Sequence, residues 1–122
     1  MNLKSFLKMC ECVDYIIVDD DDYYTYDCEI TVDVKNFNNS NDTFTSLRDE
    51  ILSMVNVKHI NAVDNTIYAH CDFNILAIKL LKNKFFEDPD ENDGTATQKI
   101  VSYLAGYASE KMLKDMISVL KK

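Results

Sequence analysis

Residues 23–34 read YYTYDCEITVDV, and this stretch decides the expected fold because its polar and apolar side chains alternate. Successive side chains of a β-strand point to opposite faces, so the alternation predicts a strand. One face would carry Asp27, Glu29 and Asp33. The other face would carry Tyr24, Tyr26, Cys28, Ile30, Val32 and Val34. We therefore expect a sheet with one acid-lined face and one face that packs on the core.

The residues before this strand complete a first hairpin. Residues 15–18, Tyr-Ile-Ile-Val, read as a short apolar strand, and the run Asp19 to Asp22 reads as a solvated acidic turn. Ahead of it, apolar side chains recur at the helical spacing i, i+3, i+4 and i+7, at Leu3, Phe6, Leu7 and Cys10. This spacing predicts a short amphipathic helix over residues 3–12.

A second hairpin is expected around Asp64-Asn65, with strands over residues 57–63 and 66–71. If the turn has two residues, positions that sum to 129 face each other. His59 then lies opposite His70, and Lys58 lies opposite Cys71. Between the two hairpins, Ser46 followed by Asp49 is typical of a helix start, which predicts a helix over residues 46–55.

The C-terminal part is expected to be helical. Asp72 would cap a helix that runs to about Phe86, and residues 87–94 would form an acidic loop. A capping box over residues 95–98 would start a last helix. Gly106 would either break this helix or let it pack closely. Its apolar side would carry Val101, Leu104, Ala108, Met112 and Met116.

These elements predict an α+β fold with a short N-terminal helix, antiparallel hairpins that form a small sheet, and a C-terminal helical hairpin. The 122 residues fit one domain, with an acidic α/β half over residues 1–72 and a helical half over residues 73–122.

The negative charge lies in the first half of the chain. The net charge is −8, and residues 1–72 contain 14 acidic against 5 basic residues, whereas residues 73–122 contain 7 against 8. Such a balance argues against direct binding to nucleic acid or to an anionic membrane, since both need basic patches. The acidity indicates either a surface for a basic partner or simple solubility.

The start of the chain indicates a cytoplasmic setting. Residues 1–18 contain Lys4, Lys8, Glu11 and Asp14 and no uninterrupted apolar run of the secretory type. No apolar run approaches the ~18–20 residues that cross a bilayer. In a reducing compartment the four cysteines would be thiols or metal ligands rather than disulfides.

The cysteines allow two interpretations. Cys10, Cys28 and Cys71 fall on the apolar sides of three expected elements, and Cys12 could complete a tetrahedral set. Zinc bound by four thiolates would tie these segments together. The alternative is ordinary buried thiols, because free cysteine is commonly buried. His59 and His70 are alternate ligands, together with a nearby aspartate.

The sequence predicts no enzyme. Gly94 and Gly106 are the only glycines, too few for a phosphate-binding loop. Residues 88–99 imitate a calcium loop but carry Asp93 where glycine is required and Lys99 where the bidentate glutamate belongs. His70 and Cys71 are neighbours on a strand and would point to opposite faces, so they would not activate one another.

The tyrosines and acids of the first hairpin predict a protein-binding surface. Alternate carboxylates on a strand stand ~6.6 Å apart, comparable to steps along a phosphate backbone. Tyrosine adds rigid contact area, and carboxylates steer a basic partner. The alternative is that these residues cover the core and keep a hairpin tip hydrated. The expected partner-binding residues are Asp19, Asp20, Asp21, Asp22, Tyr23, Tyr24, Tyr26, Asp27, Glu29 and Asp33.

Residues 3–10, LKSFLKMC, with residues 13–20, VDYIIVDD, resemble the opening of small proteins from phages and mobile elements of low-GC Gram-positive bacteria. The hairpin around Asp64 and Asn65 continues the likeness, which covers about residues 3–72. Acidic members of this kind include anti-CRISPR inhibitors of RNA-guided type II nucleases. The resemblance implies an inhibitor that blocks guide or DNA engagement. From the residues themselves we expect a non-enzymatic protein that is a monomer or a homodimer. The alternative function is a zinc-stabilised structural or assembly protein.

Overall fold

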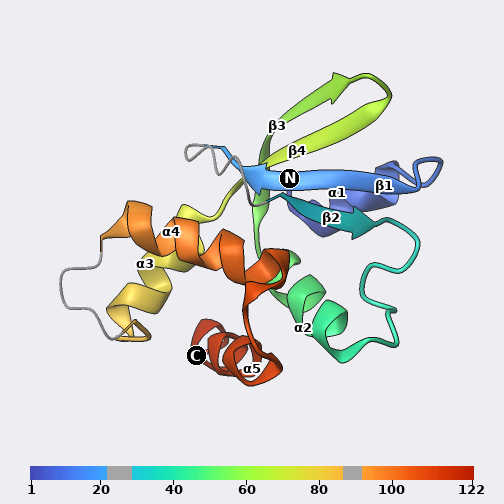
Figure 1. Cartoon of the computed structure of the whole chain (residues 1–122). Coiled ribbons are helices and arrows are strands. Elements are labelled where there is room, and N and C mark those ends of the chain that lie inside the picture. The colour runs from blue at the N-terminus through green and yellow to red at the C-terminus, as the bar shows by residue number, and fades with distance from the viewer. Residues whose placement is uncertain (22–28, 87–91) are drawn as a thin grey trace.

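The computed structural model describes residues 1–21, 29–86 and 92–122 and confirms the α+β class (Figure 1). The elements, in chain order, are α1 (Leu3–Met9), β1 (Tyr15–Asp20), β2 (Ile30–Asp33), α2 (Thr43–Leu52), β3 (Asn56–Val63), β4 (Thr66–Asp72), α3 (Asn74–Lys82), α4 (Asp93–Ser102), a π-helical turn η1 (Tyr103–Tyr107) and α5 (Glu110–Leu120).

The four strands form one sheet in the order β2-β1-β4-β3. Both expected hairpins are present and antiparallel, but β1 and β4 join them side by side in parallel. In this central pair Ile16 lies beside Ile67, and Asp19 lies beside His70. The sheet is therefore mixed. Residue patterns predicted each hairpin but held no information about which strands of the two hairpins would meet.

The first hairpin keeps the expected alternation over the residues that the structure describes. Ile30 and Val32 are buried, whereas Thr31 is exposed. Strand β1 continues through Asp19 and Asp20, so the prediction that the turn begins at Asp19 was wrong. The reason is that these two residues pair with His70 and Cys71 of β4, beyond the end of the β1–β2 pairing. The expected positions Asp22, Tyr23, Tyr24, Tyr26, Asp27 and Cys28 lie outside the described residues.

The second hairpin has the expected two-residue turn. Asp64 and Asn65 both have positive φ, 49° and 65°, which is the conformation of a type I′ turn. His59 faces His70, as predicted from the sequence. The prediction that Lys58 faces Cys71 was wrong, because a β-bulge between Val57 and His59 places Val57 opposite Cys71.

Helices α1 to α3 differ from the predicted ranges at their ends. Helix α1 stops at Met9, although Cys10 is still buried. Helix α2 begins three residues before Ser46, because the Asp42 carboxylate accepts hydrogen bonds from the Thr45 N–H and hydroxyl groups. In α3 the boundary residue is Phe73, but the Asp72 carboxylate accepts a 2.9 Å hydrogen bond from the Asn74 N–H, which confirms the predicted capping by Asp72. This helix ends at Lys82 rather than near Phe86.

The last predicted helix is two helices. Its N-terminus is capped by a reciprocal Asn92–Thr95 pair and not by a box over residues 95–98. The helix breaks at Gly106, whose φ of 120° suits glycine, and Ser109 caps α5. Because of the break, the apolar positions of α5 do not continue those of the preceding helix. The predicted apolar side through Ala108 and Met112 was therefore wrong. The buried side of α5 consists of Leu113, Met116, Ile117 and Leu120.

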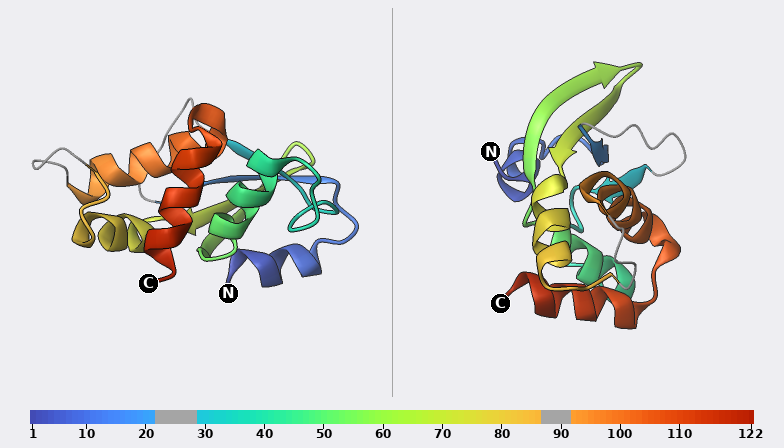
Figure 2. Two further views of the ribbon diagram at one scale, coloured as in Figure 1. Left: turned by 90° about the horizontal axis from the view of Figure 1, so that it is seen from below. Right: turned by 90° about the vertical axis from the view of Figure 1, so that its left-hand side faces the viewer.

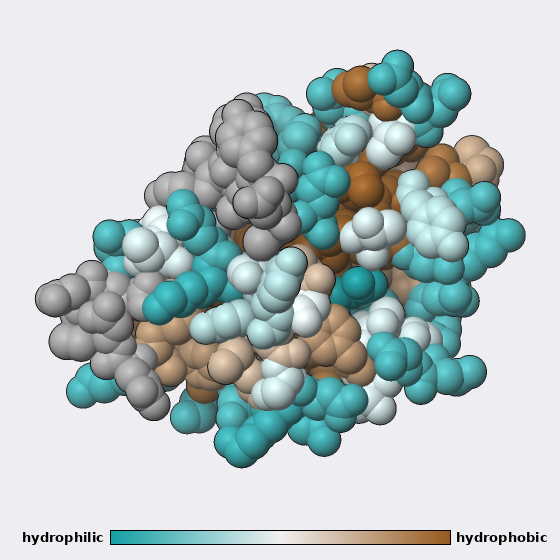
Figure 3. All heavy atoms as spheres, in the orientation of Figure 1, coloured by the Kyte–Doolittle hydropathy of each residue, from teal (hydrophilic) through white to brown (hydrophobic). Residues whose placement is uncertain are grey.

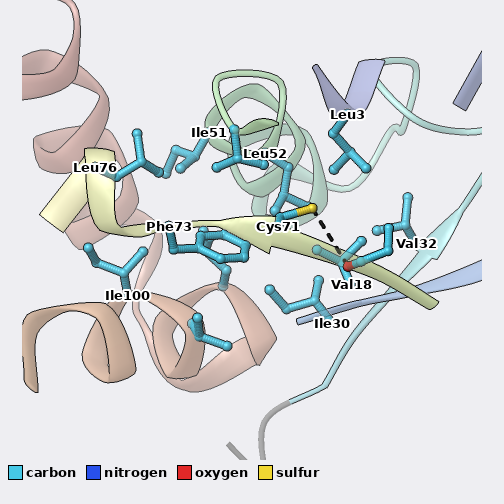
Figure 4. Packing of buried hydrophobic residues seen from close by; sticks show 14 of the residues in the cluster. Leu3, Val18, Ile30, Val32, Ile51, Leu52, Cys71, Phe73, Leu76 and Ile100 are labelled. Atoms are coloured by element: carbon cyan, nitrogen blue, oxygen red, sulfur yellow. Dashed lines mark hydrogen bonds between the residues drawn. The ribbon is translucent and has the colours of Figure 1, made fainter. Parts of the chain in front are cut away.

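Helices α2 to α5 lie on one side of the sheet, and the β3–β4 hairpin projects beyond them (Figures 1 and 2). One cluster of buried side chains joins the sheet to these helices and to α1. Figure 4 shows Leu3, Val18, Val32 and Phe73 around the Cys71 thiol, which donates a 3.6 Å hydrogen bond to the Ala69 carbonyl oxygen. We call this side of the sheet the covered face.

The helices of the described ranges are all too short or too polar to span a bilayer.

Candidate binding face of the sheet

The face of the sheet opposite the helical layer carries polar and aromatic side chains, and we call it the outer face. Strand alternation assigns to it the residues between those of the core. Its members are Tyr15, Ile17, Asp19 and Asp21 from β1 and its extension, Glu29, Thr31 and Asp33 from β2 and its start, His59 from β3, and Tyr68 and His70 from β4.

Asp19 lies at the centre of this face. The β1–β4 register places it beside His70, and their side chains meet at 2.5 Å between Oδ1 and Nδ1. On its other side the β1–β2 pairing ends at Val18 and Ile30, and the exposed Glu29 is the next residue of that neighbouring segment. Asp19 and Glu29 therefore bring acidic side chains to the same end of the outer face.

Asp21 extends the acidic row by one step. Its N–H donates to the Cys71 carbonyl oxygen at 2.9 Å, which continues the β1–β4 ladder past the end of β1. Its carboxylate lies 3.6 Å from Nε2 of His59. Each histidine of the cross-strand pair thus has its own aspartate. Among the ion pairs of the described residues, no lysine or arginine pairs with Asp19 or Asp21.

Asp20 points the other way, into the core, and is only 4% exposed. Its carboxylate accepts a 3.1 Å hydrogen bond from the Phe73 N–H, at the start of α3. The sequence grouped this residue with its neighbours as partner-binding. The alternation of the strand instead gives it a structural position, and we leave it out of the outer face.

Asp33 is on the outer face but has local hydrogen bonds. Its carboxylate accepts from the N–H groups of Lys35 and Asn36 and from the Asn36 side chain. These contacts shape the turn that follows β2. Asp33 therefore contributes charge to the outer face while it fixes the end of the strand.

Two tyrosines stand beside the acids. Tyr15 is 57% exposed, and Tyr68 stacks on His70 with ring centroids 6.3 Å apart. The sequence had drawn attention to Tyr15 only as a flanking residue and had missed Tyr68. The alternation of β4, with Ala69 and Cys71 buried, is the signal that would have placed Tyr68 on the outer face.

The described cysteines do not assemble a metal site. Burial, reinforced by the negative charges of Asp19 and Asp20, raises the pKa of the Cys71 thiol to about 12. Burial and the neighbouring Cys12 also raise the pKa of Cys10. Both effects oppose the thiolate that zinc requires. Over residues 1–21, 29–86 and 92–122, no three His, Cys, Asp or Glu side chains, His59 and His70 included, could hold a metal ion. The predicted ligand Cys28 lies outside these ranges.

A groove of about 500 Å³ lies away from the outer face, between α1 and the segment after β2. Its floor is apolar, from Leu7, Val34 and Phe37, and its rim carries Lys4, Lys8 and Lys35. No residue pattern in the sequence had predicted this groove. Lys4 and Lys8 stand one helical turn apart on α1, a like-charge spacing that mildly destabilises a helix and could have drawn attention to it.

The chain has no match among protein-family models, curated proteins or solved structures.

Proposed function

We propose that the protein is a non-enzymatic inhibitor that docks the outer face of its sheet on a basic surface of a nucleic-acid-handling protein. The observation that carries the proposal is the acidic row of Asp19 and Asp21, each of which contacts a histidine and, among the ion pairs of the described residues, no lysine or arginine. A row of like charges costs stability, and a partner that neutralises it would regain that energy.

The chemistry of the outer face suits a cationic protein better than other partners. Nucleic acid would be repelled, since it needs basic contacts and the chain carries −8. Carboxylates raise the rate at which an Arg- or Lys-rich surface associates. Tyr15 and Tyr68 add amphipathic contact area with few rotatable bonds.

Proteins that hold nucleic acid carry extended basic grooves for its backbone, and the resemblance noted above directs the proposal to RNA-guided type II nucleases. Such an effector holds its guide–target heteroduplex in a positively charged channel. An acidic sheet face seated in that channel would exclude DNA or guide. Inhibition would then be competitive with nucleic acid and would weaken as salt rises.

The test compares two triple variants that change the net charge equally. The outer-face variant combines Asp19→Asn, Asp21→Asn and Glu29→Gln. The control combines Glu50→Gln, Glu110→Gln and Asp115→Asn, whose side chains pair with lysines on helices or are exposed there. The measurement is inhibition of DNA cleavage and DNA binding by a guide-loaded type II nuclease, at 50 mM and 300 mM salt.

The outer-face variant is expected to lose inhibition by at least about tenfold, while the control keeps it. Equal losses in both variants would mean that net charge alone acts, which contradicts a docking face. Unchanged inhibition in a correctly folded outer-face variant would remove the mechanism. A wild-type protein that neither binds nor inhibits the nuclease would remove this target.

A further inference from the structure

Strand β3 is an edge strand with an open stretch. It ends the sheet order, and β4 is its only neighbour among the described strands. At its first residues, Met1 and Asn2 pair with it: the Val57 N–H donates to the Met1 carbonyl oxygen at 2.8 Å, and Asn2 bridges Asn56. None of the described segments pairs with the outer edge of residues 58–63. This edge therefore already accepts an antiparallel strand at one end and is free beyond it.

Two features that protect sheet edges, a lysine and a β-bulge, stand at one end of the free stretch, at Lys58, and residues 59–63 beyond them have neither. The free stretch has no proline, no arginine and no acidic residue, and Lys58 is its one lysine. Ile60 is 57% exposed and Val63 is 47% exposed. Figure 3 shows hydrophobic surface among polar residues in the region where Figure 1 places this hairpin. An exposed, apolar edge strand is a template for pairing with another strand.

The hairpin geometry identifies which peptide groups point outward. In a two-residue hairpin the residues that flank the turn, Val63 and Thr66, form a hydrogen-bonded pair, and such pairs alternate along the strands. The N–H and C=O groups of Asn61 and His59 thus face β4. Those of Ile60 and Ala62 face away from the sheet and are available to a new strand.

The open stretch is complementary to itself. It is bounded by Met1 and Asn2 at one end and by the Asp64–Asn65 turn at the other, and Asn61 is at its middle. A twofold axis at Asn61 places Ile60 of one copy opposite Ala62 of the other, and these are the residues with outward peptide groups. The same register brings the exposed Lys58, at the bulge, near the exposed Asp64 in the turn of the second copy.

We propose that the β3 edge joins two copies of this chain, antiparallel and related by a twofold axis at Asn61, into one continuous eight-stranded sheet. Ile60 and Ala62 exchange main-chain hydrogen bonds across the axis, and Ile60 packs against the second copy's Ala62. The Lys58–Asp64 pairs fix the register, since other registers leave these charges without an opposite partner. The interface is isologous and closes at two copies.

The first test is the mass in solution, measured by sedimentation equilibrium at 150 mM salt from roughly 10 μM to 1 mM, the range expected for a small interface. The mass should rise from 14.1 kDa toward twice that value. Ala62→Pro removes an outward N–H without touching the β3–β4 ladder and should weaken the dimer at least about tenfold. Circular dichroism verifies that the variant is folded.

A charge exchange tests the register. Lys58→Asp and Asp64→Lys each place like charges opposite one another in a homodimer, so each variant alone should dissociate. An equimolar mixture restores both opposite-charge pairs and should dimerise again. Lys82→Glu, an exposed site on α3, is the control for net charge and should dimerise like the wild type.

Amide hydrogen exchange gives a second measurement that does not depend on variants. Protection at Ile60 and Ala62 should increase with protein concentration, while that at Asn61, already bonded within the hairpin, should not. A wild-type chain that stays monomeric at 1 mM overturns the proposal. A dimer that persists in Ala62→Pro, or charge variants that show no rescue on mixing, overturns it as well.

Discussion

Strands β1 and β3 both contain apolar residues, yet β1 is built into the core and β3 stands outside it. In β1, Ile16 and Val18 are fully buried under the helical layer. In β3, every residue except Val57 is exposed. The difference is one of position, because β1 is central in the sheet and β3 lies at its edge and projects beyond the helices. Apolar content alone therefore does not identify which strand stabilises the fold and which is free to associate.

The largest expected effect is the difference in reactivity between a thiol buried on the covered face and a thiol exposed at the surface. With the pKa of Cys71 raised to about 12, its thiolate fraction at pH 8 is about a thousandfold below that of an ordinary thiol. Iodoacetamide should label the exposed Cys12 rapidly and Cys71 only after unfolding in urea. Peptide mass spectrometry reads the two sites. Equal labelling rates in the folded protein would contradict the buried position of Cys71.

The same substitution in the two hairpins should have different costs. Ile16→Ala empties a fully buried site in β1 and should lower the free energy of unfolding by about 2–5 kcal/mol. Ile60→Ala in β3 should change it by less than about 0.5 kcal/mol at concentrations where the chain is monomeric. Urea denaturation measures both. Similar losses would mean that β3 packs on the body of the protein, which would contradict its position outside the core.

Asp20 and Asp21 are neighbours in the chain but belong to opposite faces of the sheet, so substitutions of the two test the assignment of these faces. Asp20→Ala leaves the Phe73 N–H without this acceptor and should cost about 1–3 kcal/mol. Asp20→Asn keeps an acceptor oxygen and should cost less. Asp21→Ala, on the outer face, should cost less than about 0.5 kcal/mol. If Asp21→Ala were the more damaging change, the assignment of faces in β1 would be wrong.

Asp49 of α2 gives a smaller effect that depends on pH. Burial raises its pKa, although the adjacent Arg48, 3.2 Å away, favours the ionised form. A carboxyl that ionises less readily in the folded state lowers stability as pH rises through its folded pKa. The stability of Asp49→Asn relative to the wild type should therefore increase as pH rises above about 4, the ordinary pKa of an aspartate. Urea denaturation at several pH values measures this difference, and the opposite slope would contradict the cause given for the shift.

The sequence was sufficient to predict the structure where the deciding pattern lies within a few residues. The Asp64-Asn65 turn fixed the pairing of His59 with His70, and the alternation around Ile30 and Val32 identified the covered face. The amphipathic spacing from Leu3 identified α1. In each case the deciding interactions lie within a few residues, so the pattern contains them.

The rest depends on contacts between distant segments. The parallel pairing of β1 with β4 decides that Asp19 meets His70, yet nothing in either strand specifies the other. The same pairing extends β1 and turns Asp20 into the core. The bulge after Val57 and the helix break at Gly106 depend on how the hairpin and the helices fit the body. The sequence therefore predicted the residue types of the candidate site, acids and tyrosines, but not which individual residues form it.

The most direct test of the central claim, that the outer face is the recognition surface, is the affinity of a type II nuclease for three proteins. These are the wild type, the outer-face triple variant and the control triple variant of equal net charge, each titrated onto immobilised nuclease at fixed salt. The account predicts that the control binds like the wild type and that the outer-face variant binds at least about tenfold more weakly. Equal affinities for the two variants would contradict it.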